Sequence, residues 1–295
     1  MNEFILSCCS TADLSRERLD KRNIRYIYFH FFLGDKEHED DLWQSMKPQD
    51  LYSRMLAGES AKTSQVTVDE YMTYFESLLK EGKDVLHICF SSGLSGSYNS
   101  ALVAQKELAP RYPGQKLYVV DSLAASSGYG LIMETLADMR DEGKGIDELH
   151  DWIEENKLRL HHWFFSTDLT FYVRGGRVSK VSGLIGSILK ICPLLNVDKE
   201  GKLKPREKVR TKSKVMERIV QKMEEFAENG HNYTGKCFLC QSVCEEDAQA
   251  VADHIAKLFP KMNGKPEIFP IGATIGSHTG PGTVAVFFWG DERKN

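Results

Sequence analysis

The sequence lacks a strong excess of charge of either sign, and it has no long basic run. Its 295 residues include 38 Lys and Arg against 42 Asp and Glu, which gives a net charge of −4. Proteins that bind nucleic acid through charge carry a concentrated basic surface, so we expect no nucleic-acid partner. With 41% hydrophobic and 27% charged residues, the chain has enough apolar material for a folded core and differs from disordered sequences.

Long apolar segments are also missing. The short apolar stretch at 4–9 has no basic region before it, unlike a secretory signal. The weakly charged stretch at 181–197 is interrupted by Lys190 and Pro193 and is shorter than the roughly 20 residues that a spanning helix needs. Seven cysteines, an odd number, without an export signal predict free thiols in a reducing compartment. We therefore expect a cytoplasmic protein with no membrane span.

Nucleotide and metal motifs are absent as well. No Gly-x4-Gly-Lys-Ser/Thr loop and no complete Gly-x-Gly-x-x-Gly after a strand occurs. Cys237, Cys240 and Cys244 have the inner spacing of a zinc site without a second pair, which favours buried structural thiols. His161 and His162 are neighbours on a predicted strand, so alternation sends them to opposite faces. We predict no metal and no cofactor.

The rhythm of the chain is typical of an α/β fold, because short apolar runs alternate with longer amphipathic ones. A capping box of Thr67 and Glu70 begins the first predicted helix, and Gly143 and Gly230 are the expected C-terminal stops of two others. Helices are predicted at 68–80, 97–108, 127–142, 147–158, 213–228 and 245–258, and strands at 4–8, 25–32, 85–90, 116–120, 163–166, 194–197, 203–209, 236–241, 266–270 and 283–289.

Two domains are expected, at residues 1–160 and 161–295. Up to about residue 160 the alternation of strand and helix predicts a mainly parallel, Rossmann-like sheet with helices on both faces. The segment 194–209 predicts a hairpin through Glu200 and Gly201, so the second α/β domain should contain a mixed or antiparallel sheet. A ligand site is expected in the cleft between the domains.

The loop at 91–97 has the layout of an anion-binding cradle. It follows a buried strand and leads into the helix predicted at 97, and it contains Ser91, Ser92 and Ser95 with Gly93 and Gly96. Serine hydroxyls and the free N–H groups of a helix start donate hydrogen bonds, while glycines allow a ligand to approach the backbone. A tight turn that only caps the helix is the alternative.

Three other segments carry polar groups for which the local pattern leaves two interpretations open. Thr63 and Ser64 stand before the helix at 68, where a cap is the plainer explanation. A glycine-rich loop predicted at 275–282 contains His278 and Thr279, and the alternative is a solvated hairpin. Arg177 follows two glycines and either faces an acidic ligand or partner or lies on the surface.

A serine hydrolase is the competing enzyme hypothesis, with Ser95, His278 and Asp121 as a Ser-His-Asp triad. The nucleophile elbow of such enzymes has the pattern Gly-x-Ser-x-Gly. Around Ser95 the sequence is Gly-Leu-Ser-Gly-Ser, so the second glycine is displaced. An activity on an acyl ester through Ser95 and His278 stays open as the alternative.

Taken together, these motifs resemble those of the DegV family of fatty-acid-binding proteins. Thr-Ser-Gln at 63–65, Ser-Ser-Gly-Leu-Ser-Gly-Ser-Tyr at 91–98, Asp-Ser at 121–122, Gly-Gly-Arg at 175–177 and His-Thr-Gly-Pro-Gly at 278–282 follow its order and spacing over nearly the whole chain. The resemblance implies a two-domain DegV-like fold that binds one long-chain fatty acid. It also implies a non-catalytic carrier. Such a carrier presents the carboxylate to a separate fatty acid kinase, and the acyl phosphate that forms is used in phospholipid synthesis. Its contact with membranes would be transient and would serve lipid exchange.

The resemblance also assigns residues. Thr63, Ser95 and His278 match the groups that bind the carboxylate, and two helix N-termini with hydroxyl donors could stabilise it without a full counter-charge. The supporting loop residues are Ser64, Ser91, Ser92, Gly96 and Thr279, and the arginines that face the head group or the kinase are Arg177 and Arg210. Departures from the family pattern at Cys9, Val66 and Cys192 could alter kinase docking or domain packing.

Overall fold

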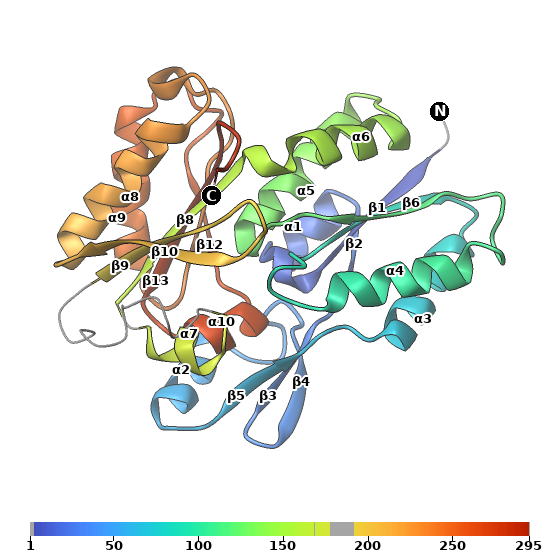
Figure 1. The fold of residues 1–295 in the computed structure, drawn as a ribbon, viewed down its shortest axis with the longest axis horizontal. Helices are drawn as coiled ribbons and strands as arrows, with labels where there is room; N and C mark the ends of the chain where they lie inside the picture. The colour runs from blue at the N-terminus through green and yellow to red at the C-terminus, as the bar shows by residue number, and fades with distance from the viewer. Residues whose placement is uncertain (1–2, 168, 178–191, 295) are drawn as a thin grey trace.

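The computed structural model of the chain describes residues 3–167, 169–177 and 192–294. The predicted α/β class is confirmed, with a four-stranded sheet, a six-stranded sheet and a smaller three-stranded sheet (Figure 1). Residues 181–191 of the weakly charged stretch lie outside the described residues. Within the described part of the chain, no helix is both long and apolar enough to cross a membrane.

The four-stranded sheet is parallel, with the order β2-β1-β6-β7, as the sequence predicts. Helices α3 and α4 pack together on one face, and α5 and α6 pack on the other (Figure 1). The predicted capping box of Thr67 and Glu70 begins α3. The elements are β1 (Phe4–Cys9), α1 (Arg16–Lys21), β2 (Ile24–Ile27), α3 (Val68–Leu79), β6 (Asp84–Cys89), α4 (Ser97–Leu108), β7 (Leu117–Asp121), α5 (Ser126–Asp141) and α6 (Ile146–Asn156).

The six-stranded sheet is mixed, with the order β10-β9-β8-β13-β11-β12, and only β11 and β12 run parallel. The hairpin predicted through Glu200 and Gly201 joins β9 to β10. Helices α8 and α9 pack together against this sheet (Figure 1). The elements are β8 (Leu160–Ser166), β9 (Cys192–Val197), β10 (Leu203–Val209), α8 (Lys212–Phe226), β11 (Phe238–Gln241), α9 (Glu245–Leu258), β12 (Glu267–Pro270) and β13 (Thr283–Trp289).

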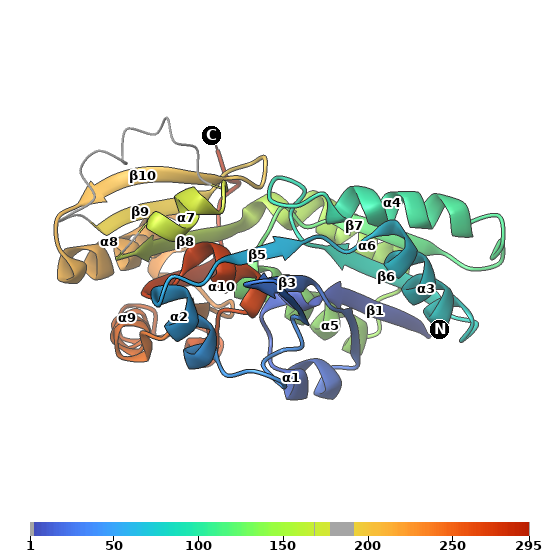
Figure 2. The same cartoon turned by 90° about the horizontal axis from the view of Figure 1, so that it is seen from below.

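A third sheet was not predicted. It is antiparallel, with the order β4-β3-β5, and its outer strands are too polar to show an apolar period. Figure 2 shows helix α10 against β3, β5 and α2, although α10 precedes β13 of the six-stranded sheet in the chain. The elements are β3 (His30–Leu33), β4 (Lys36–Glu39), α2 (Pro48–Leu56), β5 (Ala61–Ser64), α7 (Thr170–Arg174) and α10 (Ala273–Thr279).

Three sequence predictions of local structure are wrong. The strand at 25–32 is two strands, β2 and β3, because the chain passes from one sheet to another where the N–H of Phe29 donates to Ser10 Oγ at 3.0 Å. The loop at 275–282 is helical up to Thr279. Gly230 does not end α8, which stops at Phe226 because Ala227 forms a β-bridge with Gly290.

The turn of the β9–β10 hairpin contacts the serine-rich loop after β6. Ser91 Oγ donates to the carbonyl of Gly201 at 2.8 Å. Arg293 lies beneath the turn and donates to the carbonyls of Asp198 at 3.1 Å and Leu123 at 3.0 Å. The sheets are therefore joined directly beside the expected cradle.

The division into domains at residue 160 stays a prediction. The strands of the parallel sheet precede residue 122, and those of the mixed sheet lie within 160–289. However, one apolar core continues from Ile5 to Phe287, and α5 contacts strands of both sheets.

We predict that Gly93→Ala destabilises the fold. A Cβ at Gly93 would lie 2.5 Å from the carbonyl oxygen of Glu200 and 2.8 Å from that of Gly201, which are backbone atoms that cannot rotate away. Overpacking of this kind costs about 1–3 kcal/mol, so thermal unfolding should occur at a lower temperature. Gly114→Ala is the matched control, because a Cβ there meets nothing within 4 Å. Equal melting temperatures for the two variants would contradict this account of the junction.

Candidate functional site

A cavity of about 480 Å³ lies where the three sheets meet. This volume is within the range of roughly 300–1,000 Å³ that is usual for small-molecule sites. Its apolar wall includes Phe164, Val197, Leu203, Ala285 and Phe287 from strands of the mixed sheet. The sequence-predicted site residues among its lining are Thr63, Ser64, Ser92, Ser95, Gly96, Arg177, His278 and Thr279.

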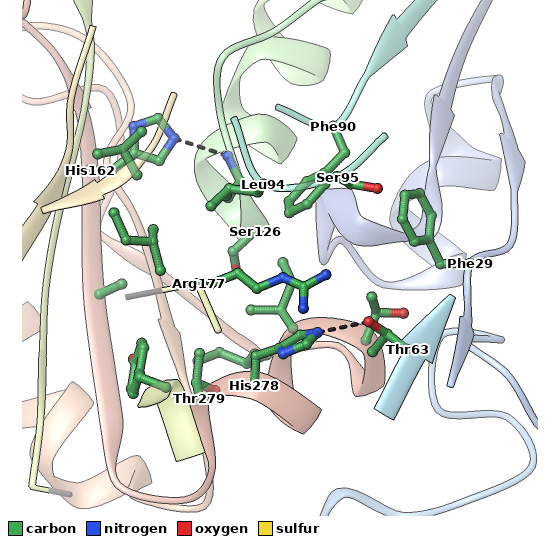
Figure 3. A pocket seen from close by; sticks show the side chains of 18 of the residues that line it. Phe29, Thr63, Phe90, Leu94, Ser95, Ser126, His162, Arg177, His278 and Thr279 are labelled. Atoms are coloured by element: carbon green, nitrogen blue, oxygen red, sulfur yellow. Dashed lines mark hydrogen bonds between the residues drawn. The ribbon is translucent and has the colours of Figure 1, made fainter. Parts of the chain in front are cut away.

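Thr63 and His278 form the central polar pair of the cavity (Figure 3). Thr63 Oγ1 lies 2.7 Å from His278 Nε2, although the two residues are 215 positions apart. Thr63 is on strand β5 and His278 is near the end of α10, and these elements pack together. The expectation that Thr63 stands at a helix N-terminus is therefore wrong, since strand pairing with Phe31 positions it.

The serine loop forms the adjoining wall, and it leads into α4 as predicted. Ser95 Oγ accepts from the N–H of Ser97 at 3.2 Å, in the first turn of that helix. A Cβ at Gly96 would overlap with Oε1 of Gln65, whose amide donates to Ser100 Oγ at 3.0 Å. Gln65 thus joins the segment after Thr63 to α4, and its side chain lies where a Cβ at residue 96 would stand.

Arg177 carries the formal charge of the cavity. Among the described residues that line it, none is Asp or Glu. Figure 3 shows the Arg177 side chain directed toward His278 and Thr63. Its guanidinium donates to the carbonyl of Gly175 at 2.6 Å. The local field therefore favours an anion at this end of the cavity.

His278 is neutral at physiological pH. Burial, with a smaller effect from the charge of Arg177, lowers the pKa of His278 to about 4. Its Nδ1 is buried against Gly175 without a hydrogen-bond partner among the described residues. A buried N–H without an acceptor is rare, so we assign the proton to Nε2. The Nε2–H then donates to Thr63 Oγ1, and the Thr63 hydroxyl is free to donate into the cavity.

Two pairs of polar groups deeper in the wall bond each other. The N–H of Ala125 donates to His162 Nε2 at 3.3 Å. Tyr172 and Thr283 share a hydrogen bond of 3.0 Å between their hydroxyls. These groups do not demand polar contacts from a ligand, so this part of the cavity presents a mainly apolar surface.

Two residues assigned by resemblance do not line the cavity. Ser91 is fully buried and bonds the hairpin turn instead. Arg210 is exposed just after β10, and its partner-facing role stays a prediction. Of the three departures from the family pattern, Cys9 and Val66 are buried in the core, and Cys192 is half-buried.

Several lining residues were missed as site residues. From the sequence, His162 and Cys240 are interpreted only as possible metal ligands or structural thiols, yet both contribute to the wall. The alternation along their strands is as predicted, since His161 stacks on Phe288 while His162 contacts Phe287 on the other face. No group of three or more His, Cys, Asp or Glu among the described residues could hold a metal ion.

Comparison with known proteins shows which protein family the chain is similar to. A family model described as "Uncharacterised protein, DegV family" matches residues 9–291. A DegV domain-containing protein of Clostridium perfringens is 36% identical over 294 residues, which is 100% of both chains. A protein of Thermotoga maritima named fatty acid-binding protein is 31% identical over 290 residues, which is 97% of each chain.

A solved structure has the same fold. It is described as fatty acid binding of a DegV family protein from Thermus thermophilus, and it superposes with a TM-score of 0.87. The match covers 99% of this chain and 100% of that one at 24% identity. At this identity the likeness establishes the fold alone.

We predict that the cavity histidines make stability depend on pH. Burial lowers the pKa of His162 well below the ordinary value and that of His278 to about 4, whereas an unfolded histidine titrates near 6.5. The unfolded chain therefore binds these protons first, so their contribution to stability is lost as pH falls from about 6.5 toward 4.

Urea unfolding at several pH values measures this effect. Each such histidine contributes a slope of up to about 1.4 kcal/mol per pH unit. His162→Gln should show a shallower fall in the free energy of unfolding between pH 6.5 and 5 than the unaltered chain. Parallel curves for the two proteins would show that His162 is not held neutral by burial.

Proposed function

Because the chain belongs to the DegV family, we propose that it binds one long-chain fatty acid in the cavity. The carboxylate lies at Thr63, Ser95 and His278, and the acyl chain extends along the apolar wall. The Thermotoga maritima relative that is named fatty acid-binding protein supports this ligand class. The proposal includes a site of action in the cytoplasm and transient contact with membranes for lipid exchange.

One observation carries the proposal. At one end of the cavity, the hydrogen-bonded pair of Thr63 and His278 lies beside the Arg177 side chain, and no described lining residue is acidic. Many of the other lining residues are aromatic or aliphatic, and two pairs of polar groups among them, Ala125 with His162 and Tyr172 with Thr283, bond each other. An amphiphile with one anionic end and a long apolar chain matches this division.

The carboxylate would accept hydrogen bonds from the hydroxyls of Thr63 and Ser95. His278 orients the first of these, because its Nε2–H occupies the lone pair of Thr63 Oγ1 and directs the Thr63 hydroxyl proton toward the ligand. A hydrogen bond to a charged group contributes about 1.5–3 kcal/mol. Burial of the acyl chain adds about 0.8 kcal/mol for each methylene.

The chain itself performs no chemistry in this proposal. A separate fatty acid kinase phosphorylates the bound carboxylate, and the acyl phosphate feeds phospholipid synthesis. Neutral donors suit this step, because they leave the carboxylate oxygens more nucleophilic than a close ion pair would. Arg177 and Arg210 are the residues proposed to face the kinase. Arg177 lines the cavity, so it is also proposed to face the head group. Arg210 lies on the surface.

The geometry does not favour the serine hydrolase alternative. A nucleophilic serine needs a histidine within hydrogen-bond reach, and that histidine needs a group that orients it. Here His278 Nε2 bonds Thr63, and its Nδ1 faces Gly175. Ser95 Oγ accepts from the backbone of Ser97. A serine-directed covalent probe is therefore expected to leave Ser95 unlabelled.

We predict that Thr63→Val and Ser95→Ala each weaken fatty acid binding by at least tenfold, because each removes a hydrogen bond to a charged group. Titration calorimetry of the delipidated protein with oleate or palmitate measures the change. Thr73→Val and Ser77→Ala are matched controls, since both residues lie exposed on α3. Unchanged affinity in both cavity variants, with the fold intact, would rule out this carboxylate site.

We predict a different outcome for Arg210→Ala. Its affinity for the fatty acid should match that of the unaltered chain, because Arg210 does not line the cavity. Removal of a surface charge at a protein interface mainly slows association, so acyl phosphate formation with purified kinase and ATP should fall several-fold at limiting carrier. An unchanged rate over a range of salt concentrations would remove Arg210 from the kinase interface.

A further inference from the structure

Helix α10 has a buried polar junction at the end opposite His278. Asp40, which follows β4, is 1% exposed. Its Oδ1 accepts from the N–H of Ala273 at 3.2 Å, and its Oδ2 accepts from the N–H of Thr274 at 3.1 Å. The helix has Gly272 as its own N-cap residue, which has no side chain to accept these bonds. The cap therefore comes from a residue 233 positions away from Ala273.

A second carboxylate contacts the same turn. Asp13, which follows β1, is 4% exposed and accepts from Ser126 Oγ. A Cβ at Gly272 would overlap with Oδ1 of Asp13, so these groups are in close contact. Both carboxylates belong to the first 40 residues of the chain, and both meet α10 where it begins.

Burying the carboxylate of Asp40 at this position would only cost free energy if its role were packing alone. Among the described residues, no Lys or Arg forms an ion pair with it, and the charged groups that face it are Asp13 and Asp41. Burial raises the pKa of Asp40. The side chain of Thr274, the N–H groups of Thr274 and Ala273, and the helix dipole stabilise its charge.

This junction is directly connected to the proposed carboxylate site. Thr274 and His278 are four residues apart, which is one helical turn, so they lie on the same face of α10. The helix packs on β3, β5 and α2, and β5 carries Thr63. A shift of the first turn would therefore move His278 relative to Thr63.

We infer that Asp40 is a positioning residue, which caps α10 from the N-terminal part of the chain and so fixes His278 Nε2 against Thr63 Oγ1. The inference rests on the proposed function, because fatty acid affinity reports the effect. Without the cap, the ligand must restore the position of His278 when it binds. The free energy of the lost cap then appears as a roughly three- to tenfold lower affinity.

A double-mutant cycle tests this role. Asp40→Ala, His278→Ala and the double variant are titrated with oleate after removal of bound lipid. Asp40→Ala should weaken binding about three- to tenfold when His278 is present, and less than twofold in the His278→Ala background. Asp35→Ala is the matched control, because that exposed carboxylate lies in the turn between β3 and β4 and should leave affinity unchanged.

A purely structural role would give a different pattern. The affinity loss from Asp40→Ala would then be the same in both backgrounds, which would overturn the inference. If Asp40→Ala does not fold, the cycle is run with Asp40→Asn, whose amide offers one acceptor oxygen for two N–H groups. A smaller loss of oleate affinity in Asp40→Asn that disappears in the His278→Ala background supports the positioning role. An equal loss in both backgrounds, or no loss in either, overturns it. If His278→Ala alone leaves oleate affinity unchanged, the proposed carboxylate site itself is wrong.

Discussion

The contact between α10 and the small antiparallel sheet is the constraint on which the site depends. Helix α10 lies in the sequence between two strands of the mixed sheet, but it packs on β3 and β5 from the first part of the chain. That arrangement brings His278 to within hydrogen-bond distance of Thr63 and closes one side of the cavity. Without it, the serine loop, the apolar wall and the histidine would belong to separate surfaces.

Burial then sets the chemistry of the cavity. It keeps His278 and His162 neutral by lowering the pKa of each, so Arg177 supplies the positive charge at the polar end. Neutral donors can bind a carboxylate while leaving its oxygens available to a second reactant. This agrees with the proposed function as a carrier, whereas a hydrolase would need the histidine directed at a serine.

The sequence predicted those parts of the structure whose causes are local. The capping box at Thr67, the serine loop before α4 and the hairpin at Gly201 follow from residues within a few positions of one another. The helix that carries His278 was predicted as a loop because its cap, Asp40, is distant in sequence. Thr63 and His278 were paired by resemblance to a family, since no spacing rule relates residues 215 positions apart.

Native mass spectrometry of the purified chain, followed by denaturation and identification of any released small molecule, tests the central claim most directly. The account predicts one long-chain fatty acid for each chain, because burial of a long apolar tail is worth several kcal/mol and should retain the ligand through purification. A chain that is empty, and that also fails to take up added palmitate or oleate, would contradict the account.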